Sequence, residues 1–217
     1  MSEMSLQQTP AAPAHHDAHG GHSQRVQNLK FATWLYLASE VVIFSVLIAT
    51  YVVFRLHNPE VMEQFHEKMN EWPGIWLVSL NTFILLASSW AMVMGLRQIQ
   101  RNNPQGLMRW IGLTALMGTV FVIFQYVEYT EMAHKGITLY YDDASGIFKD
   151  FGMRFYAPTA FHGAHVIVGV LWALYVVNNA RKGRYSDQNY IGVEVFGLYW
   201  HFVDVVWIVL FTLIYLI

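Results

Sequence analysis

The sequence of 217 residues contains no cysteine and few charged side chains. The absence of cysteine excludes disulfides, thiolate metal ligands and thiol nucleophiles. Charged residues make up 13% of the chain and hydrophobic residues 55%, so the charge content is about half that of an ordinary soluble domain. The net charge of −2 gives no indication of a nucleic-acid partner. This composition is typical of a protein that crosses a membrane several times.

Motifs of soluble enzymes are absent as well. The chain has no Walker-type phosphate loop, no Gly-x-Ser-x-Gly and no His-Glu-x-x-His, which are the usual signatures of phosphate binding, serine hydrolysis and zinc proteolysis. We therefore assign no catalytic residue and no metal ligand from the sequence.

Five apolar stretches reach the length of about 20 residues that is needed to cross a bilayer. They cover residues 31–54, 75–96, 110–132, 155–177 and 192–217. Pro, Gly, Asn and Asp residues cluster between them, as expected for connections. The sequence predicts an all-α bundle of five transmembrane helices in residues 25–217. Residues 1–24 are polar and His-rich without an apolar core, which predicts a disordered tail rather than a signal peptide.

The basic residues predict which side of the membrane each connection occupies, because Lys and Arg are enriched in cytoplasmic loops. With the N-terminus inside and the C-terminus outside, the inner side holds eight of them: Arg25, Lys30, Arg97, Arg101, Arg109, Arg181, Lys182 and Arg184. The outer side then holds five: Arg55, Lys68, Lys135, Lys149 and Arg154. An odd number of crossings agrees with this orientation.

Glu40 is the most deeply placed charge of the first stretch. It lies nine residues into the stretch, about 14 Å deep at 1.5 Å per residue. An ionisable group there costs about 2.5–3.5 kcal/mol on insertion scales, so it normally faces protein or water. We expect a neutral carboxyl, because burial disfavours the charged form. A proton-handling group and a merely hydrogen-bonded neutral carboxyl are both open interpretations.

Other polar residues occur in pairs three apart, a spacing that places them on one helix face. The pairs are Gln125 with Glu128, His162 with His165, and His201 with Asp204, and Glu194 lies in the same narrow sector as the last pair. Matched histidines and carboxyls predict His–carboxylate bonds between helices. A metal or haem centre is an alternative, although the order differs from the Glu-x-x-His repeats of di-iron bundles. Asn81 and the small residues that follow it are interpreted as packing.

These residues lie in segments that resemble a known family, subunit III of the haem–copper respiratory oxidases. The matching segments are LASEV at 37–41, LNT at 80–82, LLASS at 85–89, QYVEY at 125–129, FHGAHV at 161–166 and YWHFVDVVW at 199–207. They occur in family order across all five stretches, and the last one is long and unusual.

The resemblance implies an integral subunit that carries no redox centre or cofactor of its own, within a proton-translocating oxidase of the bacterial cytoplasmic membrane. Haems and copper would reside in partner subunits, and phospholipid would be bound. The implied partners are subunit I, by direct packing, subunit II and a small subunit IV. The implied work is to support proton uptake and stability during electron transfer to oxygen. Glu40 matches the family's buried, carbodiimide-reactive carboxyl, and the other polar candidates match interior positions, some beside lipid head groups.

The chain also departs from the family pattern. The full-length form has seven helices and the resemblance begins at the third, so lipid sites in the family's cleft would need a wall from another chain. The connection at 134–154 is longer than usual and contains YYDD at 140–143. Cytochrome c oxidase is the preferred interpretation. A quinol oxidase, a nitric-oxide-reductase-associated homologue and an independent membrane metalloenzyme are the alternatives.

Overall fold

The computed structural model describes residues 17–70, 74–139 and 150–217. Within them, helices account for every named element: α1 (Asp17–His57), α2 (Pro59–Asn70), α3 (Gly74–Gln100), α4 (Pro104–His134), α5 (Phe151–Arg181), α6 (Ile191–Phe211) and the π-helix η1 (Thr212–Leu216), which continues α6. The first 16 residues of the predicted tail and the YYDD segment lie outside the described residues. Residues 17–24 of that tail belong to α1, because extending an existing helix costs far less than starting one.

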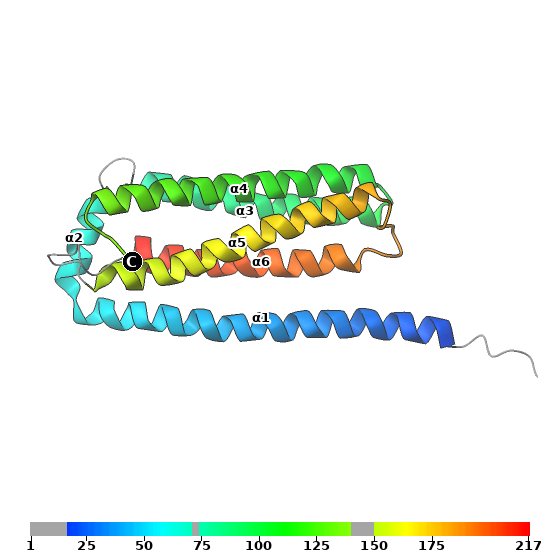
Figure 1. The fold of residues 1–217 in the computed structure, drawn as a ribbon, viewed down its shortest axis with the longest axis horizontal. Coiled ribbons are helices and arrows are strands. Elements are labelled where there is room, and N and C mark those ends of the chain that lie inside the picture. The colour runs from blue at the N-terminus through cyan, green and yellow to red at the C-terminus, as the bar shows by residue number, and fades with distance from the viewer. Residues whose placement is uncertain (1–16, 71–73, 140–149) are drawn as a thin grey trace, which may run out of the picture.

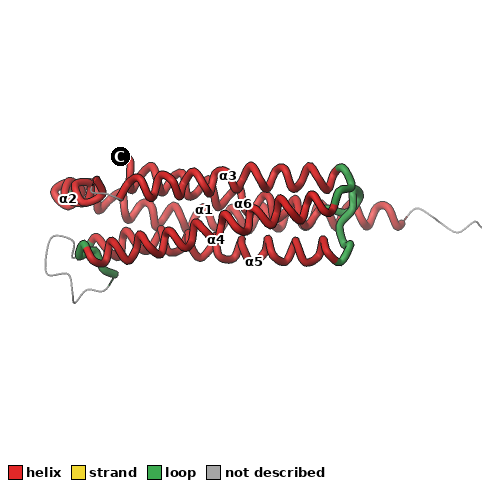
Figure 2. Tube along the Cα trace, turned by 90° about the horizontal axis from the view of Figure 1, so that it is seen from above, coloured by secondary structure: helices red, strands yellow, loops and turns green. Residues whose placement is uncertain are grey.

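Five helices are long and apolar enough to cross a membrane: Val26–His57, Gly74–Gln100, Pro104–His134, Phe151–Arg181 and Ile191–Leu216. Each coincides with one predicted stretch, which confirms the all-α fold with five spans. They run alternately in opposite directions along the long axis of the molecule, so α1 starts at the end opposite to the C-terminus (Figures 1 and 2). The eight basic residues assigned to the inner side therefore gather at the end where α1 begins.

Local signals set the ends of these helices. Asn103 caps α4, since its side-chain oxygen accepts a hydrogen bond from the Gly106 N–H at 3.0 Å, and Pro104 occupies the first turn. This arrangement satisfies a backbone donor that has no partner inside the helix. Gly183 follows α5 with φ at +66°, a conformation that glycine adopts without steric cost.

Helix α2 was not predicted from the sequence. Its buried side chains are Val61, Met62, Phe65 and Met69, whereas Glu60, Glu63 and Glu67 face outward. This pattern describes an amphipathic helix, and Figure 1 shows α2 lying across the end of the bundle where α1 finishes. A search for long apolar segments does not detect such a short, polar helix.

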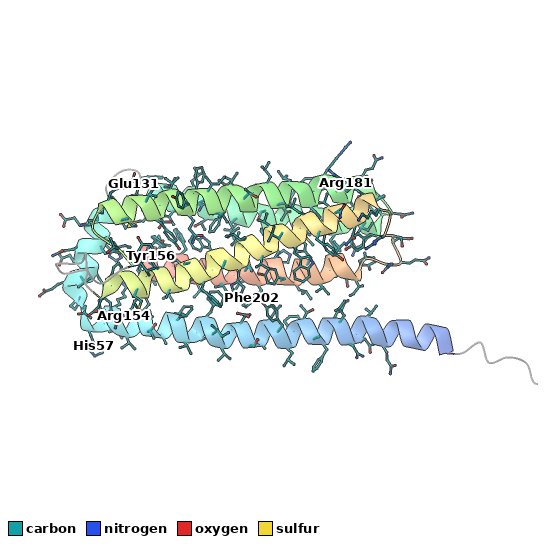
Figure 3. The ribbon with its side chains drawn as sticks, in the orientation of Figure 1. His57, Glu131, Arg154, Tyr156, Arg181 and Phe202 are labelled. Atoms are coloured by element: carbon teal, nitrogen blue, oxygen red, sulfur yellow. The ribbon has the colours of Figure 1, made fainter. Side chains whose placement is uncertain are left out.

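The core of the bundle is aromatic. The Trp200 ring lies between two glycines, and a Cβ at Gly118 or Gly169 would approach it to 2.7 or 2.5 Å. These glycines let α4 and α5 come close to α6, as small residues do between membrane helices. On the other side of α6, Phe202 lies toward α1 (Figure 3), where its ring centroid is 6.4 Å from that of Phe44.

Candidate functional site

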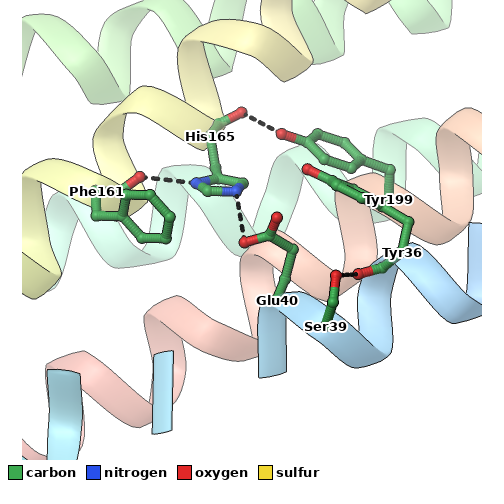
Figure 4. Close-up of polar contacts among 6 residues, drawn as sticks. All are labelled: Tyr36, Ser39, Glu40, Phe161, His165 and Tyr199. Atoms are coloured by element: carbon green, nitrogen blue, oxygen red, sulfur yellow. Dashed lines mark hydrogen bonds and ion pairs between the residues drawn. The ribbon is translucent and has the colours of Figure 1, made fainter. Parts of the chain in front are cut away.

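Glu40 of α1 faces α5 rather than the membrane. Its carboxyl Oε2 lies 3.3 Å from His165 Nε2, and both side chains are 11% exposed. One turn earlier on α1, the Tyr36 carbonyl accepts a hydrogen bond from the Ser39 hydroxyl at 2.6 Å beside this carboxyl (Figure 4). The Tyr199 hydroxyl of α6 donates to the His165 carbonyl at 2.9 Å. Three helices thus meet at one carboxyl–imidazole pair.

The tautomer of His165 follows from its second contact. Nδ1 lies 2.8 Å from the Phe161 carbonyl oxygen, which can only accept, so Nδ1 carries a hydrogen. On the other side of the ring, Nε2 faces Glu40 Oε2, an oxygen that has no hydrogen-bond partner among the described residues. The rings of Phe44 and Phe161 lie 5.4 and 4.7 Å from the His165 ring between centroids. The pair is therefore an imidazole–carboxyl contact walled by aromatic side chains.

A second polar node joins α3 to α6. Ser89 Oγ lies 3.0 Å from His201 Nδ1 and donates to Asp204 Oδ2. Asp204 is 4% exposed, and its other oxygen has no hydrogen-bond partner among the described residues. His201 and Asp204 were predicted to share a face, but the serine that links them was interpreted only as a packing residue.

Glu194 forms an ion pair at the end of the bundle where α1 and α6 begin. Lys30 Nζ lies 2.6 Å from its Oε2, and the two side chains are 42% and 24% exposed. The sequence argument grouped Glu194 with His201 and Asp204 and did not identify Lys30. Partial exposure at a helix end makes this pair a surface feature, and such pairs add little stability.

Gln125 and Glu128 face different partners from one side of α4. The Gln125 amide donates to the Thr159 carbonyl at 3.0 Å and to the Tyr129 hydroxyl at 3.1 Å. Glu128 Oε1 accepts from the Tyr215 hydroxyl at 2.5 Å, across to the π-helix. Gly163 makes room for the amide, since a Cβ there would lie 2.5 Å from Gln125 Oε1. Both residues are buried and satisfied inside the bundle.

His162 breaks the predicted pattern. It is fully buried, and neither ring nitrogen has a hydrogen-bond partner among the described residues. Its ring stacks on Trp207 with centroids 4.9 Å apart and meets Phe121 edge-on at 5.8 Å. Of these two histidines, His165 lies against a carboxyl of another helix and His162 does not.

Polar residues of α3 form hydrogen bonds with α4 and with the indoles of α6. Asn81 donates to the Phe121 carbonyl of α4 at 3.1 Å. Thr82 and Ser88 accept hydrogen bonds from the Trp207 and Trp200 indoles at 2.9 and 3.0 Å. The sequence analysis did not predict these two hydrogen bonds, although Thr82 and Ser88 lie in segments that it matched to the family. Within the described residues, no three His, Cys, Asp or Glu side chains gather where they could hold a metal ion.

Comparison with known proteins decides the family. The family model described as cytochrome c oxidase subunit III matches residues 12–217. The chain belongs to that family. This subunit III chain is 38% identical over 202 residues to cytochrome c oxidase subunit 3 of Synechocystis sp., covering 93% of the chain and 80% of the relative. It is 32% identical over 183 residues to quinol oxidase subunit 3 of Bacillus spizizenii, covering 84% of each.

Family membership and the five spans make this chain a multi-pass membrane protein that associates with other oxidase subunits. The names of the relatives include both cytochrome c and quinol oxidases. Both kinds of electron donor are therefore represented at similar levels of identity.

Proposed function

We propose that this subunit III chain is a non-catalytic member of a bacterial aerobic cytochrome c oxidase. It packs on subunit I, which holds the haems and copper, and supports proton uptake and stability during electron transfer to oxygen. The observation that carries the proposal is the Glu40–His165 pair, a carboxyl and an imidazole 3.3 Å apart inside the membrane-spanning part of the chain. Ionisable groups placed inside a membrane bundle commonly belong to proton pathways, so this pair suits a subunit beside an enzyme that consumes protons.

The proposal includes an orientation, a location and further partners. The chain lies in the cytoplasmic membrane with its N-terminus inside, because eight basic residues belong to segments at the end where α1 begins. Among the described residues, four lie at the other end: Arg55, Lys68, Lys135 and Arg154. Subunit II, a small subunit IV and phospholipid complete its surroundings. Large apolar side chains such as Trp34, Phe83 and Leu171 are exposed on the outer faces of α1, α3 and α5, which offers surface for both protein and lipid.

A quinol oxidase is the second candidate, supported by quinol oxidase relatives at 31 and 32% identity. The two differ in the reductant that drives oxygen consumption by the purified complex. Oxygen uptake with reduced cytochrome c supports the first, and uptake with quinol alone supports the second. An independent membrane metalloenzyme would require iron or copper retained by the isolated chain.

The test is affinity purification of the tagged chain from native membranes, followed by a haem spectrum and turnover assays. We expect a haem-bearing catalytic subunit to accompany the chain. We also expect the complex with Glu40→Gln to lose activity faster during sustained turnover, because the amide cannot take up or release a proton. Val41→Ala, at a half-exposed neighbour, is the matched control. Purification of the chain alone, or equal inactivation of both variants, contradicts the proposal.

A further inference from the structure

We propose that Ser89, His201 and Asp204 form a proton relay that stores one proton on Asp204, taken from a groove between α1, α3 and α6. The relay deepens the proton-supporting role proposed above and rests on it for its biological purpose. Its chemistry depends only on the residues of this chain.

The groove connects His201 with the end of the bundle where α1 begins. A cavity of about 340 Å³ is lined by Lys30, Glu194 and His201 among others. A cavity of about 440 Å³ continues it toward the membrane interior and shares Trp34, Leu198 and His201 with it. At the outer end, a cavity of about 180 Å³ shares Lys30 and Glu194 and reaches the loop between α5 and α6.

This route offers access to one side of the His201 ring only. Nδ1 is turned to Ser89 and His201 is among the residues that line the groove, so Nε2 is the ring nitrogen left to take a proton from it. Asp204, three residues further along α6, is buried behind the serine. A proton from the groove therefore meets the imidazole before it can meet the carboxyl.

The number of hydrogens at the node allows two arrangements. Ser89 has a single hydroxyl hydrogen but two polar neighbours, so one of them must donate to it. In the first arrangement Ser89 donates to an ionised Asp204 and accepts from the Nδ1–H of His201. In the second, a protonated Asp204 donates to Ser89, which donates to the unprotonated Nδ1. The heavy atoms occupy the same positions in both.

Uptake of one proton converts the first arrangement into the second. The proton binds to Nε2 and makes an imidazolium. The Nδ1–H bond then breaks as its hydrogen forms a bond to Ser89 Oγ, and the Ser89 O–H bond breaks as its hydrogen forms a bond to Asp204 Oδ2. His201 ends neutral with its hydrogen on Nε2, and Asp204 ends neutral. The reverse sequence returns the proton to the groove.

Few other charges act on this node. Of the residues that line the groove, Lys30 of α1 and Glu194 of α6 are charged, and they pair with each other. His165 of α5 lies against Glu40 of α1, 3.3 Å from its carboxyl. Ser89 is the polar partner from α3. Protonation of the node is therefore set by access from the groove and by the serine link.

The test is time-resolved infrared spectroscopy of the full chain in lipid nanodiscs after a downward pH jump. We expect a C=O band of a protonated carboxyl to appear in the unmutated chain and to be absent in Asp204→Asn. We expect Ser89→Ala to slow its appearance by roughly 10²-fold, the size of a lost proton-transfer group. Ser89→Thr, which keeps the hydroxyl, is expected to retain the fast phase.

Two results would overturn the relay: a band that persists in Asp204→Asn, or one that appears equally fast in Ser89→Ala and Ser89→Thr. Circular dichroism of each variant shows whether it folds, and Asp204→Asn keeps the test decisive if Ser89→Ala does not. The infrared result is independent of oxidase assembly. If the unmutated chain shows no C=O band but a haem-bearing subunit co-purifies with it, the relay is wrong and the proposed function stands. If the band appears as expected but no haem-bearing subunit co-purifies, the proposed function is wrong and the relay stands.

Discussion

Two histidines three residues apart on α5 have opposite surroundings. His165 has a carbonyl partner at 2.8 Å on one nitrogen and a carboxyl at 3.3 Å on the other. His162 is fully buried, and neither of its ring nitrogens has a hydrogen-bond partner among the described residues. The first is a polar link that ties α1 to the bundle. The second lies against the rings of Phe121 and Trp207 and behaves as one more aromatic core residue.

The difference follows from helix geometry. Three residues advance the direction of a side chain by about 300°, so the two rings leave α5 about 60° apart. The two side chains therefore lie on one side of the helix but contact different neighbouring helices. His165 is directed at α1, whereas His162 is directed between α4 and α6. An unpartnered buried polar group costs about 1–3 kcal/mol, whereas a partnered one does not.

The largest expected effect comes from His165→Leu. It leaves the Glu40 carboxyl buried without its partner, and we expect the free energy of unfolding to fall by about 1–3 kcal/mol. Thermal unfolding of the purified chain in detergent, followed by circular dichroism, measures it.

The double variant Glu40→Leu with His165→Leu provides the control. It removes both polar partners together, so it should recover much of the stability lost in His165→Leu, as apolar replacements of buried pairs often do. A double variant as unstable as the sum of the two single variants would show that the pair contributes nothing as a pair.

The five spans were predictable because a long apolar run is a local property of the sequence. The candidate polar residues were predictable for the same reason, since an ionisable group in such a run is conspicuous wherever it faces. Their partners were not. The spacing of His162 and His165 gives a shared side of one helix, but no local signal says which helix lies opposite or by what angle.

The contacts of Ser89 and Lys30 were not predicted, for a related reason. Ser89 and Lys30 carry no mark in the sequence, because serine is common in packed membrane helices and lysine is common at their ends. Only the meeting of α3 with α6, and of α1 with α6, gives them their contacts. The matching family segments contain Ser89 but not Lys30, so the motif alone would have suggested one of the two.

A smaller effect, of opposite sign, is expected from His162→Leu. This variant is the same change as His165→Leu, one turn away on the same helix. It removes a polar ring that has no hydrogen-bond partner, so the free energy of unfolding should stay equal or rise by up to about 1 kcal/mol. The same thermal unfolding measurement applies. A loss as large as that of His165→Leu would mean that His162 has a polar partner, such as a buried water, that holds it in place.

The smallest effect extends the comparison to His66, on α2 outside the membrane-spanning segments. Burial lowers the pKa of His66 and the nearby Arg55 lowers it further, against a hydrogen bond to the Ile214 backbone. The unfolded chain then binds a proton more readily than the folded one. Stability contributed by neutral His66 is complete above about pH 6.5, the unfolded value, and declines as the pH falls below it. Unfolding midpoints between pH 8 and 5 should show this decline, and His66→Gln should flatten it. An equal decline in His66→Gln would assign it to other groups.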